Sequence, residues 1–233
     1  SMISDDSFYM EMKKDYAPEM VTAFIRLNGA TVGCVANRSE VYTDGEKTAT
    51  YDAALTAAGC EKAAAFVNFC NAFEIPVLTL VNVDGYKNCK CNEKKIAKAA
   101  ARLTYAFANA DVPKVTVVVG KANGTAGLTM NSKSIGSDIV YAWKNAKIGV
   151  MEAAPAVKIM YADEIAKADN AAALINEKAA QYNEMQASAL AAAKRGYVDD
   201  IIEASETRQR VAAAFEMLFT KREDRPSKKH GTI

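Results

Sequence analysis

Apolar residues follow two different spacings in the first half of the chain. Some form short runs of strand length, and others recur at helical spacing or lie among good helix formers. The short runs predict strands at Met20–Leu27, Thr31–Ala36, Pro76–Val83 and Val112–Val119, the first two forming a hairpin. Helices are predicted at Cys60–Phe73 and Glu93–Ala110. This order of strands and helices indicates βαβ units and an α/β fold with a mostly parallel sheet.

The pattern becomes mainly helical in the last third of the chain. Two short strands are expected before it, at Asp138–Trp143 and Ile148–Met151, and only helix from Ala154 onward. Within that part we expect one or two exposed helices in Ile159–Ala193, a turn at Arg195-Gly196, a buried joint at Tyr197–Ile202 and a last helix at Ser205–Lys221. The polar stretch Asn37–Thr56 is expected to be largely loop.

Composition indicates a globular protein. Half of the 233 residues are hydrophobic and 24% are charged, which is too apolar for a disordered chain. We treat residues 1–233 as one domain, with 1–15 as an N-terminal extension and about 154–233 as its mostly helical part. The formal net charge of +1 gives no overall attraction to nucleic acid. No apolar run approaches the roughly 20 residues that span a bilayer, and no secretory signal is present, so we predict a cytoplasmic protein without membrane insertion.

Few side chains offer nucleophilic or metal chemistry. The single histidine, His230, lies near the C-terminal end, so the sequence has no Ser/His/Asp or Cys/His constellation. The cysteines are odd in number, which predicts against a disulfide framework, and they are Cys34, Cys60, Cys70, Cys89 and Cys91. A thiolate metal site needs about four ligands, so Cys89-Lys90-Cys91 is interpreted as two loop cysteines.

The segment Gly120–Gly127 is the most suggestive local feature. A buried strand leads into a turn that contains glycine and opens a short helix with small side chains, ending at about Lys133. The first N–H groups of a helix are unpaired and lie at the positive end of its dipole. Such a turn suits an oxyanion hole. Glycine is also required there for purely local reasons, and the pattern alone favours that structural interpretation.

A series of motifs then runs through nearly the whole chain in order. They are Tyr16–Gly29, Val32-Gly33, Val35–Asn37, Lys62–Cys70, Phe73–Pro76, Glu93, Ala110–Thr116, the Gly124 loop, Met130, Ser132-Lys133, Ala142-Trp143, Val150-Met151, Arg195–Ile202, Glu206–Arg208 and Lys229–Gly231. In these residues the chain resembles the C-terminal half of the biotin-dependent acyl-CoA carboxyltransferases. That family includes the transferase subunits of acetyl-CoA and propionyl-CoA carboxylases and related acyl-CoA decarboxylases.

The resemblance implies a fold, an activity and a set of site residues. The fold would be crotonase-type, with stacked ββα units and a peripheral helical segment. The activity would move a carboxyl group between carboxybiotin, held on a carrier protein, and a small acyl-CoA. The backbone amides of Thr125 and Ala126 would stabilise charge on the biotin ureido oxygen. The substrate-binding residues would be Gly85, Tyr86, Gly124, Ala153 and Ala156.

Three departures from the family pattern fall at this implied biotin pocket. Thr125 replaces a glycine, and a β-branched residue resists positive φ. Asp84 replaces the proline before Gly85, and Glu152–Ala156 replaces a stretch that contains glycine. Two alternatives therefore stay open: a non-catalytic assembly or regulatory subunit, and a stand-alone crotonase-type acyl-CoA enzyme.

The resemblance also implies partners. The acyl-CoA half of the site belongs to an N-terminal domain in this family, so a separate N-half subunit and a biotin carboxyl carrier protein are expected. Met2 and the ending near Lys229–Gly231 favour a split subunit over a cut domain. A homo- or hetero-oligomer is expected. The Met and Tyr residues between Tyr161 and Met185 are predicted to pack against a partner subunit.

Overall fold

The computed structural model describes residues 2–43 and 46–223, and in this part of the chain eight strands form one main sheet. The strand order is β1-β2-β3-β7-β9-β10-β12, with β11 beside the end of β9. These strands are β1 (Met10–Glu11), β2 (Met20–Leu27), β3 (Ala30–Asn37), β7 (Val77–Val83), β9 (Lys114–Asn123), β10 (Ile139–Trp143), β11 (Lys147–Gly149) and β12 (Asp200–Ile202). His230 and the Lys229–Gly231 motif lie outside the described residues.

The predicted hairpin and βαβ units are present. Strands β2 and β3 are antiparallel over Met20–Leu27 and Ala30–Asn37, and their turn uses Asn28 and Gly29, both at positive φ. Strand β3 is parallel to β7, and β7 is parallel to β9. The two connecting helices begin a few residues earlier than the sequence predicted, as α1 (Ala57–Ala72) and α2 (Lys90–Asn109).

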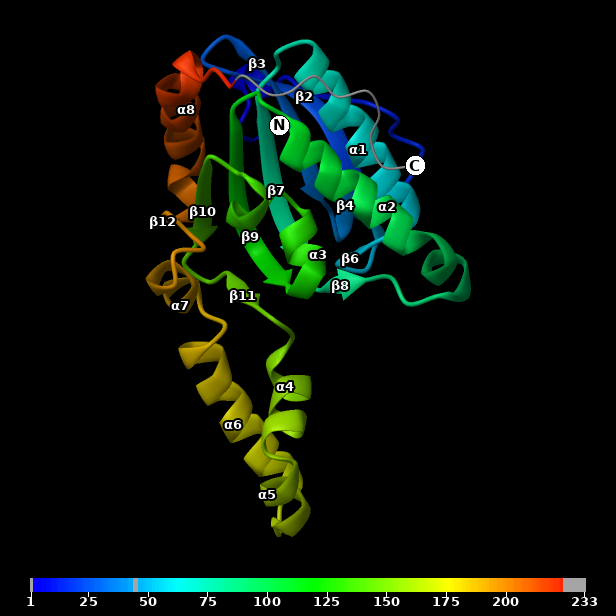
Figure 1. Cartoon of the computed structure of the whole chain (residues 1–233), viewed down its shortest axis with the longest axis vertical. Coiled ribbons are helices and arrows are strands. Elements are labelled where there is room, and N and C mark those ends of the chain that lie inside the picture. Colours follow the sequence, from blue (N-terminus) through cyan, green and yellow to red (C-terminus); the bar gives the residue numbers. More distant parts are fainter. Residues whose placement is uncertain (1, 44–45, 224–233) are drawn as a thin grey trace.

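The sheet has a hydrophobic core on each face. On one side α1 and α2 pack against it through buried residues such as Val67, Leu103 and Phe107. On the other side α8 (Thr207–Met217) covers Ile25, Leu78 and Val115. Figure 1 shows α8 on the left of the sheet and the α1–α2 pair on the right. The central strands are therefore buried on both faces, which explains their nearly continuous apolar sequence.

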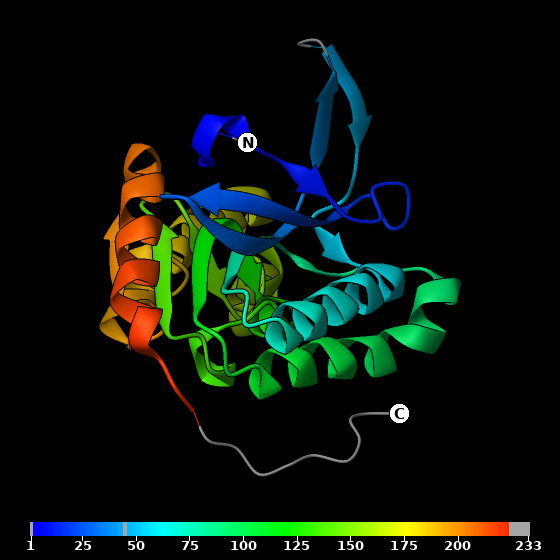
Figure 2. The same cartoon turned by 90° about the horizontal axis from the view of Figure 1, so that it is seen from above.

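The expectation of a largely irregular segment at 37–56 is wrong. The chain forms an antiparallel pair, β4 (Glu40–Thr43) with β5 (Glu46–Thr50), and then β6 (Ala54–Leu55). This hairpin projects from the body (Figure 2), and β5 buries no residue fully. Such a pair hides no apolar face, so its strands lack the alternation that identifies a half-buried strand.

The expectation of helix alone after Ala154 is also wrong. Residues Asp200–Ile202 form β12, which pairs in parallel with β10. The stretch Ile159–Ala193, expected to hold one or two helices, contains α5 (Ala162–Lys167) and α6 (Ala171–Met185) whole. It also overlaps the end of α4 (Ala153–Met160) and most of α7 (Ala189–Lys194). Asn170 and Ser188 are N-caps whose side chains accept hydrogen bonds from the third residue beyond them. These caps are sequence signals for helix starts that the composition of the segment obscured.

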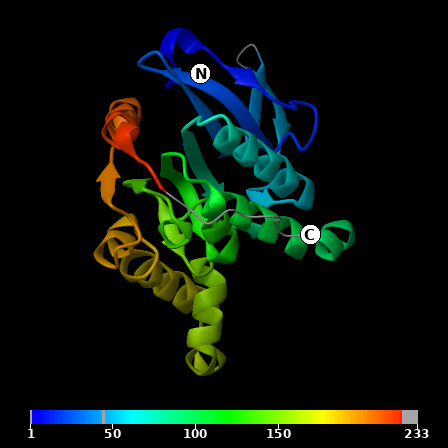
Figure 3. The ribbon, with the colours of Figure 1, turned by 45° about the horizontal axis from the view of Figure 1, so that its top comes forward.

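Helices α4, α5 and α6 form an arm that extends away from the sheet (Figures 1 and 3). Neither α5 nor α6 contains a fully buried residue, and large apolar side chains such as Ile159, Met160 and Met185 are exposed. This exposure agrees with the predicted packing against a partner subunit, which stays a prediction. Among the described residues, no helix has both the length and the apolar character needed to cross a membrane.

The packing of α2 against the sheet gives a first testable prediction. Leu103 is fully buried in the α1–α2 core, so Leu103→Ala removes packed atoms and leaves a cavity. We expect the free energy of unfolding to fall by about 2–5 kcal/mol. Leu190→Ala is the matched control, because Leu190 is exposed and its replacement should change stability by less than about 0.5 kcal/mol. Denaturant unfolding measures both, and equal effects would contradict the assigned core.

Candidate active site

The end of β9 leads directly into α3 (Gly124–Thr129), and two glycines make this sharp turn feasible. Gly124 has φ +56°, and a side chain there would lie 3.0 Å from the carbonyl oxygen of Val150. A side chain at Gly127 would lie 2.7 Å from the backbone of Ala122. Glycine is therefore required at both positions, by the backbone conformation at the first and by close approach at both.

The amides of Thr125 and Ala126 lie in the first turn of α3. Neither amide N–H makes a hydrogen bond to another described residue, as expected for groups that begin a helix. The positive φ of this turn falls on Gly124, not on Thr125, so the backbone strain expected of Thr125 does not arise. Thr125 does expose its side chain at the start of the helix, whereas Ala126 is buried.

A cavity of about 670 Å³ opens beside this turn. Its apolar part includes Val118, Ala122 and Ile148, and the start of α3 contributes Gly124 and Thr125. A volume of this size is ordinary for a small-ligand site, and small residues at the turn leave the α3 backbone accessible. Of the seven predicted site residues, only Gly124 and Thr125 line the cavity.

The other predicted residues lie around the turn. Tyr86 and Gly85 form the short strand β8 (Gly85–Tyr86), and the Tyr86 hydroxyl lies 3.2 Å from the Thr129 hydroxyl on α3. Ala153 and Ala156 are buried on α4, which packs along α6. The structure thus brings Tyr86 onto α3, while the two alanines serve the packing of the arm.

A buried network of hydrogen bonds holds the segment that follows α3 against β9. Thr116 in β9 lines the cavity, and its hydroxyl bonds to the Asn131 carbonyl at 2.8 Å and to the Ser137 hydroxyl at 3.0 Å. The Asn131 amide nitrogen donates to the same Thr116 hydroxyl at 2.9 Å. Because buried polar groups are costly when unpaired, this network fixes the chain that follows α3. The Ser132 hydroxyl, also on the cavity wall, has no partner within the described chain.

The cavity also has a polar rim that the sequence analysis did not assign to the site. Its residues include Lys133, Gln186, Arg195 and Tyr197. Lys133 is tied to Asp199 at 2.7 Å, and Arg195 donates to the Gln186 carbonyl at 2.9 Å. The signal was present, since Ser132-Lys133 and Arg195–Ile202 are among the family motifs. Only the fold shows that these two distant motifs meet at one opening.

Two of the departures from the family pattern meet in one ion-pair network. The Lys121 ammonium lies 2.8 Å from the Asp84 carboxylate and 2.6 Å from the Glu152 carboxylate. Asp84 also accepts a hydrogen bond from the Asn123 side chain at 3.1 Å. Hydrogen bonds to Asp84 and then Glu152 raise the pKa of Lys121. The network ties the ends of β7 and β9 to the residue that precedes α4.

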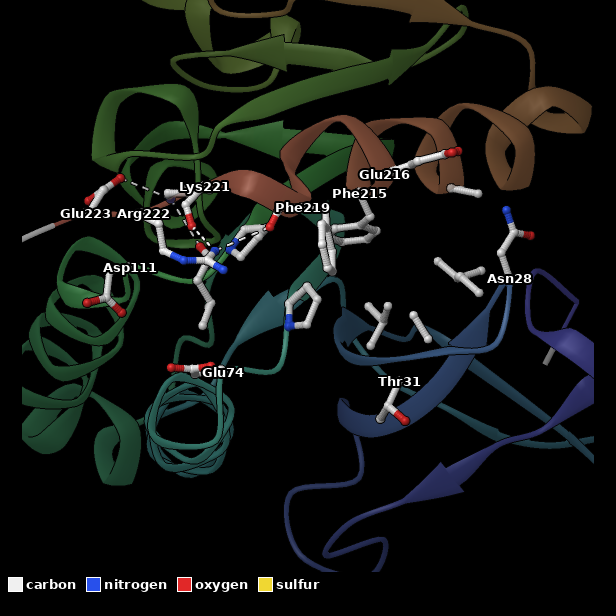
Figure 4. A pocket seen from close by; sticks show the side chains of 17 residues that line it. Asn28, Thr31, Glu74, Asp111, Phe215, Glu216, Phe219, Lys221, Arg222 and Glu223 are labelled. Atoms are coloured by element: carbon white, nitrogen blue, oxygen red, sulfur yellow. Dashed lines mark hydrogen bonds and ion pairs between the residues drawn. The ribbon is translucent and has the colours of Figure 1, made fainter.

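Another cavity, of about 720 Å³, lies between the β2–β3 turn and α8 (Figure 4). Phe215 and Phe219 form part of its wall, and Lys221 lies 2.9 Å from Asp138 and 3.1 Å from Glu223 at its edge. None of the seven predicted site residues lines it. Although it is the larger of these two cavities, it has no connection to the α3 turn.

The Lys121 network gives a second testable prediction. Lys121→Met leaves two carboxylates without their shared cation, so the start of α4 should open more often. We expect exchange of the Ala156 amide, which donates to the Glu152 carbonyl, to accelerate up to about fivefold, since a partly exposed pair contributes about 0.5–1 kcal/mol. Hydrogen exchange measured by mass spectrometry tests this at low salt.

Lys144→Met is the matched control, because Lys144 forms a longer and more exposed pair with Glu203. Its effect on α4 should be nil. The folded-state pKa of Lys121 is raised, so the stabilisation should be complete below the ordinary lysine pKa of 10.5 and disappear as pH rises through the higher folded value. Unchanged exchange in Lys121→Met would show that the network does not hold the arm.

Comparison with known proteins places this geometry in a family. The model of the Carboxyl transferase domain matches residues 1–233. The chain is 41% identical over 232 residues to the methylmalonyl-CoA carboxyltransferase 12S subunit of Propionibacterium freudenreichii subsp. shermanii. It is 40% identical over 238 residues to the methylmalonyl-CoA decarboxylase subunit alpha of Propionigenium modestum. Each match covers 99% of this chain and 43% of the relative.

The solved structures agree. A transcarboxylase 12S crystal structure, with methylmalonyl-coenzyme A and methylmalonic acid bound, superposes with a TM-score of 0.90 at 42% identity. It is matched over 99% of this chain and 43% of its own. The expected crotonase-type α/β fold is thereby confirmed. The chain spans less than half the length of the relatives it matches, and it belongs to the carboxyl transferase domain family.

Proposed function

We propose that this chain is the biotin-side part of an acyl-CoA carboxyltransferase. The observation that carries the proposal is the start of α3, where the unpaired amides of Thr125 and Ala126 adjoin a cavity of about 670 Å³. The family relationship supplies the reaction class, transfer of a carboxyl group between biotin and an acyl-CoA. Biotin would supply a ureido nitrogen that carries the carboxyl group.

The residues present fit that group. The ureido oxygen needs hydrogen-bond donors where its negative charge grows as the carboxyl group leaves, and the two α3 amides offer them without a side chain. Gly124 and Gly127 hold these amides in place through the turn geometry described above. The apolar wall of Val118, Ala122 and Ile148 suits the uncharged body of the ligand and excludes water from the donors.

The rest of the enzyme would come from elsewhere. The chain matches 43% of its relatives, so we propose that an N-half subunit or domain binds the acyl-CoA and that a carrier protein delivers biotin. The exposed apolar residues of the α4–α6 arm support the proposal that this arm forms a subunit interface in such an oligomer. A cytoplasmic location is part of the same proposal.

A second candidate is a non-catalytic assembly subunit, and Thr125 is the observation that favours it. Its exposed side chain stands at the start of α3, where the ligand must approach closely. If it blocks the site, Thr125→Gly should create activity in a complex that otherwise has none. If the site is active as it is, Thr125→Gly should change the KM for biotin, whereas Thr125→Ser should keep a KM close to that of the original chain.

The central test removes one amide N–H from α3 without changing a side chain. Incorporating lactic acid at position 126 replaces the Ala126 amide by an ester. In the complex with an N-half subunit, we expect carboxyl transfer to biotin to slow by about 10²–10³-fold, the usual effect of losing one oxyanion-hole donor. Steady-state transfer from a dicarboxylic acyl-CoA to biotin measures the effect.

The matched control replaces the Ala189 amide by an ester in the same way. Ala189 is likewise a buried alanine at the start of a short helix, but that helix is α7 and not the α3 turn. Its ester should transfer at the original rate. An Ala126 ester that transfers equally fast would overturn the amide role. Turnover of an acyl-CoA by the isolated chain without biotin would favour the stand-alone enzyme instead.

A further inference from the structure

The pair Cys89 and Cys91 has no role in the proposed transfer, and the structure changes its interpretation. These residues do not lie in a loop: Cys89 is the N-cap of α2, and Cys91 is in its first turn. Their sulfur atoms are 3.0 Å apart, and Cys91 is exposed to solvent. A disulfide S–S bond is about 2.05 Å long, so a shift of about 1 Å would join them.

The surrounding chain holds the two thiols in this position. Asn92 is buried next to them, and its side chain accepts from the Ala57 N–H at 2.7 Å and donates to the Lys87 carbonyl at 2.7 Å. The Asn92 N–H donates to the Cys89 carbonyl at 3.0 Å. The hydrogen bonds of Asn92 therefore hold the backbone around Cys89 and Cys91 in place.

Hydrogen bonds and a nearby charge shift the pKa values of the two thiols in opposite directions. The hydrogen bond from Cys91, the nearby backbone N–H of Asn92 and the charge of Lys87 lower the pKa of Cys89. The same hydrogen bond raises the pKa of Cys91. The other three cysteines differ, because burial raises the pKa of Cys34, Cys60 and Cys70 to about 12. Thiolate reactivity in the described chain is thus concentrated at the start of α2.

We propose that Cys89 and Cys91 form a redox-active dithiol that closes reversibly to an intrachain disulfide in exchange with a small disulfide oxidant. The Cys89 thiolate attacks one sulfur of the oxidant, whose S–S bond breaks as a mixed disulfide forms and one thiolate leaves. Cys91 then loses its proton to solvent and attacks the Cys89 sulfur, which releases the second thiolate. Two protein thiols are oxidised, and one disulfide is reduced to two thiols.

The segment that precedes the pair in the chain reaches the α3 turn. Tyr86 lies three residues before Cys89, and its hydroxyl contacts Thr129 on α3 at 3.2 Å. Thr129 in turn donates to the carbonyl of Thr125 at 2.9 Å. A bond between residues only two apart closes a small ring, and exposed or strained disulfides of this kind are readily reduced. The dithiol is therefore suited to a reversible change of redox state.

The experiment treats the reduced chain with oxidised glutathione under native conditions, alkylates the remaining thiols and identifies the peptides by mass. The expected product is a peptide in which Cys89 and Cys91 are joined, lighter by two hydrogen atoms and resistant to alkylation until it is reduced. Cys34, Cys60 and Cys70 should remain reduced and become alkylated after denaturation, which makes them internal controls.

Two single variants separate the roles of the sulfurs. Cys91→Ser should stop at a stable glutathione adduct on Cys89, and Cys89→Ser should not form the intrachain disulfide. Serine is a good N-cap, so Cys89→Ser should preserve α2. A wild-type product that keeps glutathione, a disulfide-linked dimer, or the absence of a glutathione adduct on Cys89 in Cys91→Ser would overturn the proposal. None of these readouts depends on carboxyl transfer.

Discussion

The close approach of two backbone segments at the start of α3 is the constraint on which the candidate site depends. Gly124 lies under the Val150 carbonyl, and Gly127 lies against Ala122. Only residues without a side chain allow both contacts, and the first also requires a left-handed conformation. This arrangement brings the end of β9, the start of α3 and the residues after β11 to one place. It leaves the first α3 amides without partners among the residues that the structure describes.

The rest of the structure supports that turn from several directions. The sheet holds β9 between β7 and β10, with a hydrophobic core on either face. The Thr116–Asn131–Ser137 network fixes the chain below α3, and Tyr86 contacts the helix from the side. Because Thr116, Asn131 and Ser137 are buried and hydrogen-bonded through Thr116, the chain next to α3 is held in place before any ligand arrives. That is the condition under which backbone donors stabilise developing charge effectively.

Two of the positions that depart from the family pattern are joined by one ion-pair network. Asp84 and Glu152 share the ammonium of Lys121, and Asp84 also holds the Asn123 side chain at the N-cap of α3. A proline before Gly85 and a glycine-containing stretch before α4 could not make these contacts. Asp84 and Glu152 therefore form a charged link between the sheet and the arm.

The sequence by itself determined the central architecture. Apolar runs such as Val77–Val83 and the helices on either side of it follow from burial on both faces, which is a local property of the residues. The motifs determined the family, and the glycine turn indicated where unpaired amides lie. The motifs Ser132-Lys133 and Arg195–Ile202 were recognised in the sequence, but the sequence did not show that both contribute to the rim of the same cavity.

Tertiary structure decided the remainder. Strand β12 exists because three residues find an open edge beside β10, and the β4–β5 hairpin because two exposed strands pair with each other. Neither leaves a periodic apolar signal. The polar rim of the cavity and the Lys121 network join residues tens of positions apart, and the assignment of Cys89 to a helix start depends on where α2 begins. Distances between such residues arise only when the chain has folded.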